Sequence, residues 1–223
     1  MKSFTKYITS KTLQPAIKKY LAKTRIYQYQ NISLTIPPGV FHPGFFFSTK
    51  ILLKHVLSLQ LNKKKLLELG AGSGLISFTT AQKNAIVTAT DINPLVIEFL
   101  KLNSKTNNIS VQIILSDLFD DIEKQQFDII VINPPYYKKN PEKNADFAWY
   151  CGENGEYFEK LFHQLKNYMH NETEICMVLC DGCDIDMIKS IAGKNGFTMK
   201  IILMKQNLIE NNFIFNIESI KAL

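Results

Sequence analysis

The sequence predicts an α/β protein built on a doubly wound, mostly parallel sheet. From residue 47 onward, apolar runs of strand length alternate with amphipathic runs of helix length, which is the pattern of repeated βαβ units. The expected strands are apolar and rich in β-branched residues, which indicates that helices bury them on both faces. Two final strand-like runs follow each other without a helix, which predicts an antiparallel hairpin at one edge of the sheet.

The first expected helix is FSTKILLKHVLSLQL, residues 47–61, in which apolar side chains recur at helical spacing. The short apolar run KLLELG, residues 65–70, predicts a buried strand. A helical pattern returns in SGLISFTTAQK at 73–83, and AIVTATD at 85–91 predicts the next strand. The following helix is expected at about 94–105.

The series continues with two apolar strands, VQIILSD at 111–117 and FDIIVIN at 127–133. A helix is expected at about 154–169, followed by the strand EICMVLC at 174–180 and a helix at about 184–195. The closing runs FTMKIILMK and FIFNIES form the predicted hairpin.

A boundary is expected near Ile36, where two prolines follow a basic segment. We expect residues 1–36 to form a basic, helical N-terminal arm and residues 37–223 to form the folded domain. Residues 1–67 carry twelve Lys or Arg and no Asp or Glu, so their net charge is +12. Residues 68–223 carry fourteen basic and twenty acidic residues, so theirs is −6.

A basic arm on a mildly acidic body favours a polyanionic partner such as RNA or the ribosome. A solvated lysine-rich helix explains the same charges equally well, because Arg25 alone offers bidentate phosphate contacts.

Composition predicts a soluble, cytoplasmic protein without a membrane partner. Apolar side chains make up 46% of the 223 residues, which is enough for one full core, and no run is long enough to span a bilayer. The four cysteines form no regular framework, which is typical of a reducing compartment. Cys176, Cys180 and Cys183 have no fourth partner nearby, and we therefore predict no metal site.

Doubly wound sheets bind ligands at the carboxyl ends of their strands. The first strand ends in ELGAGSGL, where Gly70, Gly72 and Gly74 form a turn into a helix. Glycines there let the backbone turn tightly and approach a ligand closely. Leu75 stands where a dinucleotide site has a third small residue, which argues against a nicotinamide or flavin. A tight turn without any ligand is the plainer interpretation of these glycines alone.

The next two strands end in aspartates. Asp91 follows Gly74 by seventeen residues, where a carboxylate can accept both hydroxyls of a ribose. Asp117 is placed to meet an exocyclic amine such as that of adenine. Each aspartate alone is more often a cap or turn residue. A glycine turn and two aspartates on three successive strand ends are much less expected by chance.

The fourth strand ends in FDIIVINPPYYKK. Two prolines fix φ, remove two backbone donors and hold Asn133 in an extended conformation. Such a rigid turn is either a strand terminator or a preorganised clamp for a planar ligand.

Together, the glycine turn, Asp91, Asp117 and the run Asn133-Pro134-Pro135-Tyr136 resemble the S-adenosylmethionine-dependent methyltransferases that act on amino groups attached to planar carbon. The resemblance covers roughly residues 37–218. The chain is most similar to the HemK-type release-factor glutamine methyltransferases, because ATDINPLVIEFLKLN and CGENGEYFEKLF match segments of that family. The upstream GVFHPGFFFSTKILL is at least as similar to ribosomal RNA guanine methyltransferases.

The resemblance implies the Rossmann-like class I methyltransferase fold with seven strands. It implies S-adenosylmethionine as the cofactor, bound by Glu68, Gly70, Gly72, Gly74, Asp91, Asp117 and Asn133. The residues from Asn133 to Tyr136 are the expected catalytic set. The Asn133 side-chain carbonyl and the Pro134 backbone carbonyl can each accept one N–H of the target, and Tyr136 can stack on it or simply pack the loop.

Three functions remain in view from the sequence. The expected reaction is methylation of a glutamine side chain in a translation release factor or another translation protein. The alternative is an exocyclic amine of adenine or guanine in RNA, which the basic arm would serve. A cofactor-binding scaffold without catalysis is less favoured, because the Asn-Pro-Pro-Tyr run is intact.

Overall fold

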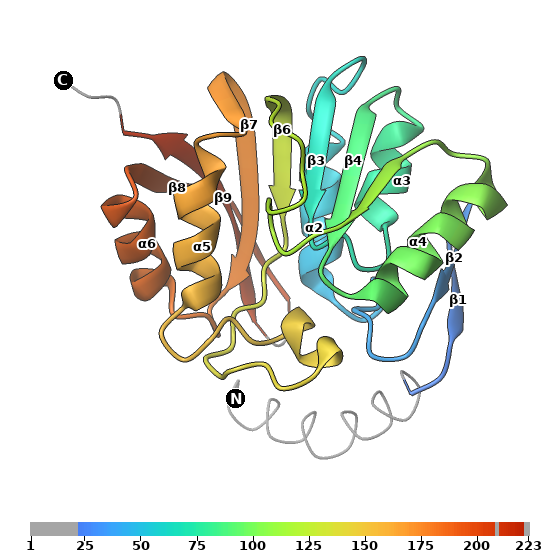
Figure 1. Ribbon diagram of the computed structural model, residues 1–223, viewed down its shortest axis with the longest axis horizontal. Helices are drawn as coiled ribbons and strands as arrows, with labels where there is room; N and C mark the ends of the chain where they lie inside the picture. The colour runs from blue at the N-terminus through green and yellow to red at the C-terminus, as the bar shows by residue number, and fades with distance from the viewer. Residues whose placement is uncertain (1–21, 208–209, 221–223) are drawn as a thin grey trace.

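The computed structural model describes residues 22–207 and 210–220 of the chain (Figure 1). Its elements in chain order are β1 (Arg25–Tyr29), β2 (Ile32–Ile36), α2 (Phe47–Val56), β3 (Lys65–Leu69), α3 (Leu75–Ala81), β4 (Ile86–Asp91), α4 (Pro94–Asn107), β5 (Gln112–Leu115), β6 (Phe127–Ile132), η1 (Asn144–Ala148), α5 (Glu156–Leu165), β7 (Met169–Cys180), α6 (Ile185–Lys194), β8 (Phe197–Gln206) and β9 (Asn211–Ser219).

The predicted fold class is confirmed. Seven strands form one sheet in the order β5-β4-β3-β6-β7-β9-β8, and the first five of these are parallel. The predicted hairpin is also present, because β9 runs antiparallel to both β7 and β8, and β8 forms the edge (Figure 1).

Helices cover both faces of the sheet. On one face, α2, α3 and α4 pack with Ile129 and Val131 of β6 into a first buried cluster. On the other face, α5 and α6 pack against Ile130 and Ile132 of the same strand. All four of these side chains are at most 2% exposed. The alternation explains why the central strand is apolar throughout, since each face of β6 meets a helical layer.

The parallel register brings the strand ends to one edge of the sheet. Leu69 at the end of β3 lies opposite Thr90 of β4 and Ile132 of β6. Asp91 at the end of β4 lies opposite Leu115 of β5. The segments that follow these four strands therefore emerge side by side.

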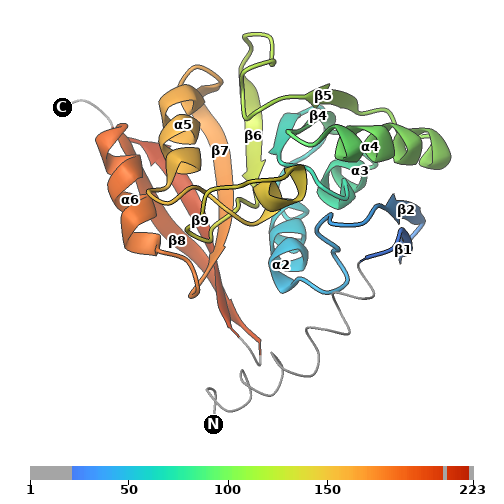
Figure 2. The same cartoon turned by 60° about the horizontal axis from the view of Figure 1, so that its bottom comes forward.

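The expectation of a helical arm is wrong for residues 25–36. These residues form an antiparallel hairpin beside α4 (Figure 2), and Ile32, Leu34 and Ile36 are buried in the first core cluster. The alternation of buried and half-buried side chains along β2 has a period of two, which is that of a strand. Residues 1–21, the rest of the expected arm, lie outside the described residues, and the division at residue 36 remains a prediction.

Two asparagines of α4 hold the exposed edge of β2. Asn103 accepts from the Thr35 N–H at 2.8 Å and donates to the Thr35 carbonyl at 3.1 Å. Asn107 makes the same pair of hydrogen bonds with Ser33, both at 2.8 Å. A side-chain amide carries one acceptor and two donors, so each asparagine replaces a strand partner. The hairpin is thereby fixed to the helix that follows β4.

Three element boundaries differ from the expectation by four residues or more. Helix α2 ends at Val56 rather than near residue 61. Helix α5 ends at Leu165 rather than near residue 169, and β7 begins at Met169, five residues before the expected start. A bulge in the pairing of β6 with β7 accommodates the extra residues. Tyr168 between the two elements is buried and donates to carbonyls of the segment after β5. Among the described residues, no helix has the length and apolar character needed to cross a membrane.

A glycine comparison tests how tightly the turn before α3 is packed. Gly74 has φ +77°, and an added Cβ would lie 2.5 Å from Leu100 and Phe78. Gly196 has φ +83°, but an added Cβ would meet nothing within 4 Å. We expect Gly196→Ala to cost about 1–2 kcal/mol for the left-handed backbone alone. Gly74→Ala should cost roughly a further 1–3 kcal/mol for overpacking. Urea unfolding of both variants measures the difference, and equal losses would contradict the packing.

Candidate active site

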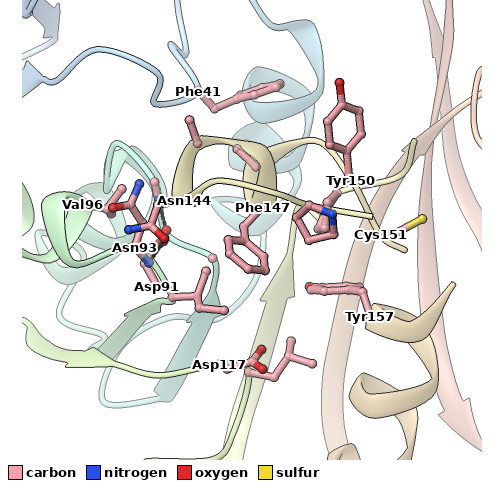
Figure 3. A pocket seen from close by; sticks show the side chains of 18 of the residues that line it. Phe41, Asp91, Asn93, Val96, Asp117, Asn144, Phe147, Tyr150, Cys151 and Tyr157 are labelled. Carbon is pink, nitrogen blue, oxygen red and sulfur yellow. Dashed lines mark hydrogen bonds between the residues drawn. The ribbon is translucent and has the colours of Figure 1, made fainter. Parts of the chain in front are cut away.

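A cavity of about 310 Å³ lies at the carboxyl edge of the sheet. The ends of β3, β4, β5 and β6 contribute Gly70, Asp91, Asp117 and Asn133 to its wall. The side chains of Asp91, Asp117, Phe147 and Tyr157 surround the open space in Figure 3. The strand register therefore assembles in one place residues that are far apart in the sequence.

The glycine turn forms the floor beside β3. Gly70 has φ +69°, and a Cβ added there would project into open space rather than into protein. Because Gly70 lines the cavity, this open space is the cavity itself. The turn therefore combines a backbone conformation that favours glycine with room for close approach by a ligand.

Asp91 uses part of its carboxylate to hold this turn. One oxygen accepts from the Gly72 N–H at 3.0 Å, and the other accepts from the Asn93 N–H at 3.0 Å. Burial raises the pKa of Asp91 above its ordinary value, although these two backbone donors oppose the shift. A carboxylate has about four acceptor positions, so positions remain for a ligand at the cavity wall.

Glu68 faces inward, beneath the turn. It is 6% exposed, and one carboxylate oxygen accepts from the Ser77 N–H at 2.8 Å and from the Ser77 hydroxyl. Burial raises its pKa from 4.5 to about 8, while the Ser77 hydrogen bonds act in the opposite direction. Glu68 lines a second cavity of about 50 Å³ and not the larger one. Its contacts hold the first turns of α3.

Asp117 stands on a short, strained loop after β5. The neighbouring Leu118 has φ +56°, which is rare for a residue other than glycine. The hydroxyl of Ser116 donates to the Leu118 carbonyl at 2.9 Å and accepts from the Asp121 N–H at 3.0 Å. Asp117 also accepts from Lys160 of α5 at 2.5 Å. The loop is therefore tied both to itself and to the helix that covers it.

Asn133 lies between the two cavities and lines both. Its Nδ2 donates to the Thr49 hydroxyl, 84 residues earlier in the chain, at 3.3 Å. Among the described residues, no group donates to its Oδ1. The Thr49 contact therefore orients the amide with its acceptor unused.

The two prolines and Tyr136 surround this amide. Pro135 lines the larger cavity, whereas Pro134 and Tyr136 line the smaller one. Burial raises the pKa of Tyr136 well above its ordinary value, so the phenol is neutral. Tyr136 and Tyr137 are in ring contact, with centroids 4.8 Å apart. The turn thus presents an aromatic wall beside the Asn133 side chain.

Residues 137–152, here named the strap, contribute much of the lining of the larger cavity and were not predicted as a structured part of the site. The strap contains η1, and a bridge between Tyr137 and Tyr150 closes its ends. Trp149 packs on Phe41 at 5.2 Å and on Phe46 at 5.4 Å between ring centroids. The aromatic residues in FAWYC were the one sequence signal for this packing.

The structure brings most of the predicted site residues to the larger cavity, namely Gly70, Gly72, Asp91, Asp117, Asn133 and Pro135. Gly74 packs under the turn instead, and Glu68, Pro134 and Tyr136 line the smaller cavity. Sequence reasoning missed Thr49, Tyr157 and Lys160, which meet these residues only through the fold. Cys180 and Cys183 have sulfurs 3.7 Å apart, and the described residues contain no His, Cys, Asp or Glu group suited to hold a metal.

Residues 31–184 match the sequence model of a protein family, the methyltransferase small domain. This match covers more than half of the chain. The chain belongs to the methyltransferase small domain family. It is an S-adenosylmethionine-dependent methyltransferase, as the motifs predicted, and the match begins inside the β1–β2 hairpin rather than at residue 37.

Curated relatives differ in their acceptors. The chain is 33% identical to a protein N5-glutamine methyltransferase of Methanocaldococcus jannaschii, over 65% of this chain and 74% of that protein. It is 32% identical to a release factor glutamine methyltransferase of Dictyoglomus turgidum, over 66% and 58% of the two chains. It is 30% identical to ribosomal RNA small subunit methyltransferase C of Haemophilus influenzae, over 59% of this chain and only 43% of that one.

Solved structures support the same fold. A T. thermophilus 16S rRNA methyltransferase, solved with S-adenosylmethionine and guanosine, matches with a TM-score of 0.61 at 18% identity. The match covers 88% of this chain and 50% of that one. An E. cuniculi complex responsible for methylation of a translation termination factor matches with a TM-score of 0.62 at 19% identity, over 81% and 99% of the chains.

The residues at the larger cavity fit S-adenosylmethionine. Gly70 leaves space where a Cβ would stand, and Asp91 keeps acceptor positions beyond those used by the turn. Asp117 has one oxygen that accepts no hydrogen bond from the described residues. The cavity thus offers close backbone approach and two separated carboxylates, which suit an adenosine with a polar tail.

The raised pKa of Glu68 makes a prediction for stability. The unfolded chain ionises this group above about pH 4.5, whereas the folded chain keeps it protonated until about pH 8. The folded state therefore binds more protons in this window, and the stability contributed by the group is lost as pH rises through it. Glu68→Gln removes this titration and keeps an acceptor for Ser77. Between about pH 4.5 and pH 8, the free energy of unfolding of Glu68→Gln should therefore rise relative to that of wild type, by up to about 1.4 kcal/mol per pH unit.

Denaturant unfolding across the window measures this difference, with the exposed Glu98→Gln as the control. A difference between Glu68→Gln and wild type that does not change with pH would show that Glu68 is ionised in the folded chain.

Proposed function

We propose that this methyltransferase transfers the methyl group to a planar amino nitrogen, and that its substrate is a glutamine side chain in a translation release factor. The observation that carries this proposal is the oriented amide of Asn133. Its Nδ2 is engaged by Thr49, and its Oδ1 is left without a donor at the junction of the two cavities. A planar –NH₂ group is what such an acceptor pairs with.

The cofactor-binding role of the predicted residues is part of the proposal. The ribose hydroxyls bind the remaining acceptor positions of Asp91, and the adenine amino group binds Asp117. Gly70 and Gly72 contact the methionine portion through their backbone. Glu68 and Gly74 act indirectly, because their contacts support the turn and the start of α3.

When bound, S-adenosylmethionine supplies an electrophilic methyl group on a sulfonium. The task of the protein is geometric, since the lone pair of an amide or ring amine is delocalised and is a poor nucleophile. Asn133 Oδ1 and the Pro134 carbonyl each accept one N–H of the target and hold its nitrogen toward the methyl group. Orientation of this kind can contribute roughly 7–11 kcal/mol to lowering a barrier.

No side chain is required as a general base, because the alkylated nitrogen is acidic enough to lose its proton to water. Tyr136 is neutral and partly buried, and it forms a wall for the planar target. Strap residues such as Phe147 and Tyr150 line the larger cavity and give part of its wall an aromatic, apolar surface.

The relatives whose length the chain covers most fully favour glutamine over RNA as the methyl acceptor. It spans 74% of the M. jannaschii glutamine methyltransferase, compared with 43% of the H. influenzae ribosomal RNA methyltransferase.

A second candidate function is methylation of an exocyclic amine of adenine or guanine in RNA. The observation that favours it is the charge of residues 1–67, which carry twelve basic and no acidic residues. A segment of this charge attracts nucleic acid at low ionic strength. Asn133 and Pro134 accept the same two N–H groups from a ring amine as from an amide.

Labelled S-adenosylmethionine distinguishes these functions. The protein is incubated with purified release factor and with total RNA from the same organism, and the label is followed through protease and ribonuclease digestion. Label on a release-factor glutamine, identified by mass spectrometry of peptides, supports the proposal. Label that resists protease and is lost with ribonuclease supports the RNA function.

Asp91 should control cofactor affinity. We expect Asp91→Ala to weaken binding of S-adenosylhomocysteine by about 1.5–3 kcal/mol, the usual contribution of hydrogen bonds to a charged group. Asp91→Asn keeps the shape of the turn and should lose part of this amount. The exposed Asp186→Ala, in the first turn of α6, is the control. Calorimetry gives the affinities, and tight binding of NAD or an unaffected Asp91→Ala would refute the assignment.

Asn133 should control transfer rather than cofactor binding. We expect Asn133→Ala to reduce the methyl transfer rate by about 100-fold or more, while cofactor affinity stays within a small factor. Asn133→Asp adds a negative charge beside the sulfonium, so cofactor binding should tighten while transfer falls. The exposed Asn167→Ala is the matched control.

Both quantities are measured on the same purified variant with the acceptor found above. If Asn133 only terminates β6, Asn133→Ala loses some stability and keeps a specific activity close to that of wild type.

A further inference from the structure

Lys160 joins the covering helix to the loop after β5. Its Nζ lies 2.5 Å from Asp117 Oδ2 and 2.6 Å from Asp120 Oδ2. Gln164, one turn further along α5, donates to the other oxygen of Asp120 at 2.6 Å. Positions three and four residues apart lie on one face of a helix, and this face also carries Tyr157 at the cavity wall. One side of α5 therefore binds the loop that contains Asp117 and Asp120.

The contact leaves the two oxygens of Asp117 in different states. Oδ2 is taken by Lys160, whereas Oδ1 accepts no hydrogen bond from the described residues. The side chain of Asp117 is 46% exposed, so without a partner it would be able to turn toward solvent. Lys160 and Asp117 both line the larger cavity, while Asp120 does not. The lysine therefore limits Asp117 to an orientation beside the cavity.

We propose that Lys160 is a positioning residue for adenine recognition, which holds Asp117 by one oxygen so that the other accepts from the adenine 6-amino group. The proposal rests on the placement of Asp117 against adenine in the proposed function, and it is independent of the methyl acceptor. Partial burial lowers the pKa of Lys160, but its bonds to Asp117 and Asp120 outweigh this and raise it, so the lysine is charged when it binds them.

Two alternatives predict different behaviour. If Lys160 competes with adenine for Asp117, its removal tightens cofactor binding. If Lys160 contacts the cofactor itself, its removal weakens binding even when Asp117 is absent. Calorimetry on the purified full chain separates these cases with two probes, namely S-adenosylhomocysteine and the same compound with hydrogen in place of the adenine 6-amino group.

Lys160→Met should weaken binding of S-adenosylhomocysteine by about three- to ten-fold, as expected for a partly exposed ion pair that acts through its partner. Binding of the compound without the amino group should change by less than about two-fold. In an Asp117→Ala background, Lys160→Met should have no further effect on either probe. Lys166→Met, an exposed lysine at the end of α5, controls for loss of charge.

Unchanged or tighter binding by Lys160→Met would overturn the proposal, and so would equal losses for both probes or a loss that persists without Asp117. Wild-type protein that binds both probes equally would refute the adenine contact of Asp117, and the role of Lys160 with it. Thermal unfolding of each variant without ligand confirms that the affinities refer to folded protein.

Discussion

The register of the parallel strands β3, β4 and β6 is the constraint on which the site depends. Leu69 aligns with Thr90 on one side and Ile132 on the other, so the glycine turn, Asp91 and Asn133 emerge at the same level of the sheet. A slip of one residue in β4 would turn Asp91 toward the opposite face. The buried side chains of Val87 and Ala89 on β4 oppose such a slip, because each already fills a place in the first core cluster. Packing of the core therefore determines the geometry of the site.

Two buried carboxylates at this edge show how the fold accommodates polar groups. Glu68 is protonated near neutral pH and accepts from Ser77, so its burial carries no charge. Burial also raises the pKa of Asp91, although Gly72 and Asn93 donate to its carboxylate and oppose the shift. Glu68 supports the turn from beneath, whereas Asp91 lies at the wall of the larger cavity with acceptor positions left for a ligand. The place of each acid in the fold therefore gives the two acids different roles.

The sequence predicts what is local to one strand or one strand end. Periodicity marks the apolar strands, and glycine, aspartate and proline mark their ends, so the fold class and the residues at the cavity could be inferred. Contacts across the fold leave no such pattern. Thr49 meets Asn133 across 84 residues, and Lys160 meets Asp117 across 43. The β1–β2 hairpin was missed because the hydrogen-bonding edge of β2 is completed by side chains of Asn103 and Asn107, whose role is visible only after α4 is placed.

The choice of methyl acceptor and the transfer of the methyl group depend on different parts of the protein. In the proposed clamp, Asn133 Oδ1 and the Pro134 carbonyl each accept one N–H group of the target, and an amide and a ring amine both present two such groups. Discrimination between them therefore depends on groups beyond the clamp, where Tyr136, Tyr137 and the strap form the surroundings. The strap is held by the packing of Trp149 on Phe41, by the ion pair between Lys138 and Asp184, and by Cys151, which is buried in the second core cluster. We therefore expect changes in the strap to alter the choice of acceptor, while the residues at the strand ends keep the same cofactor.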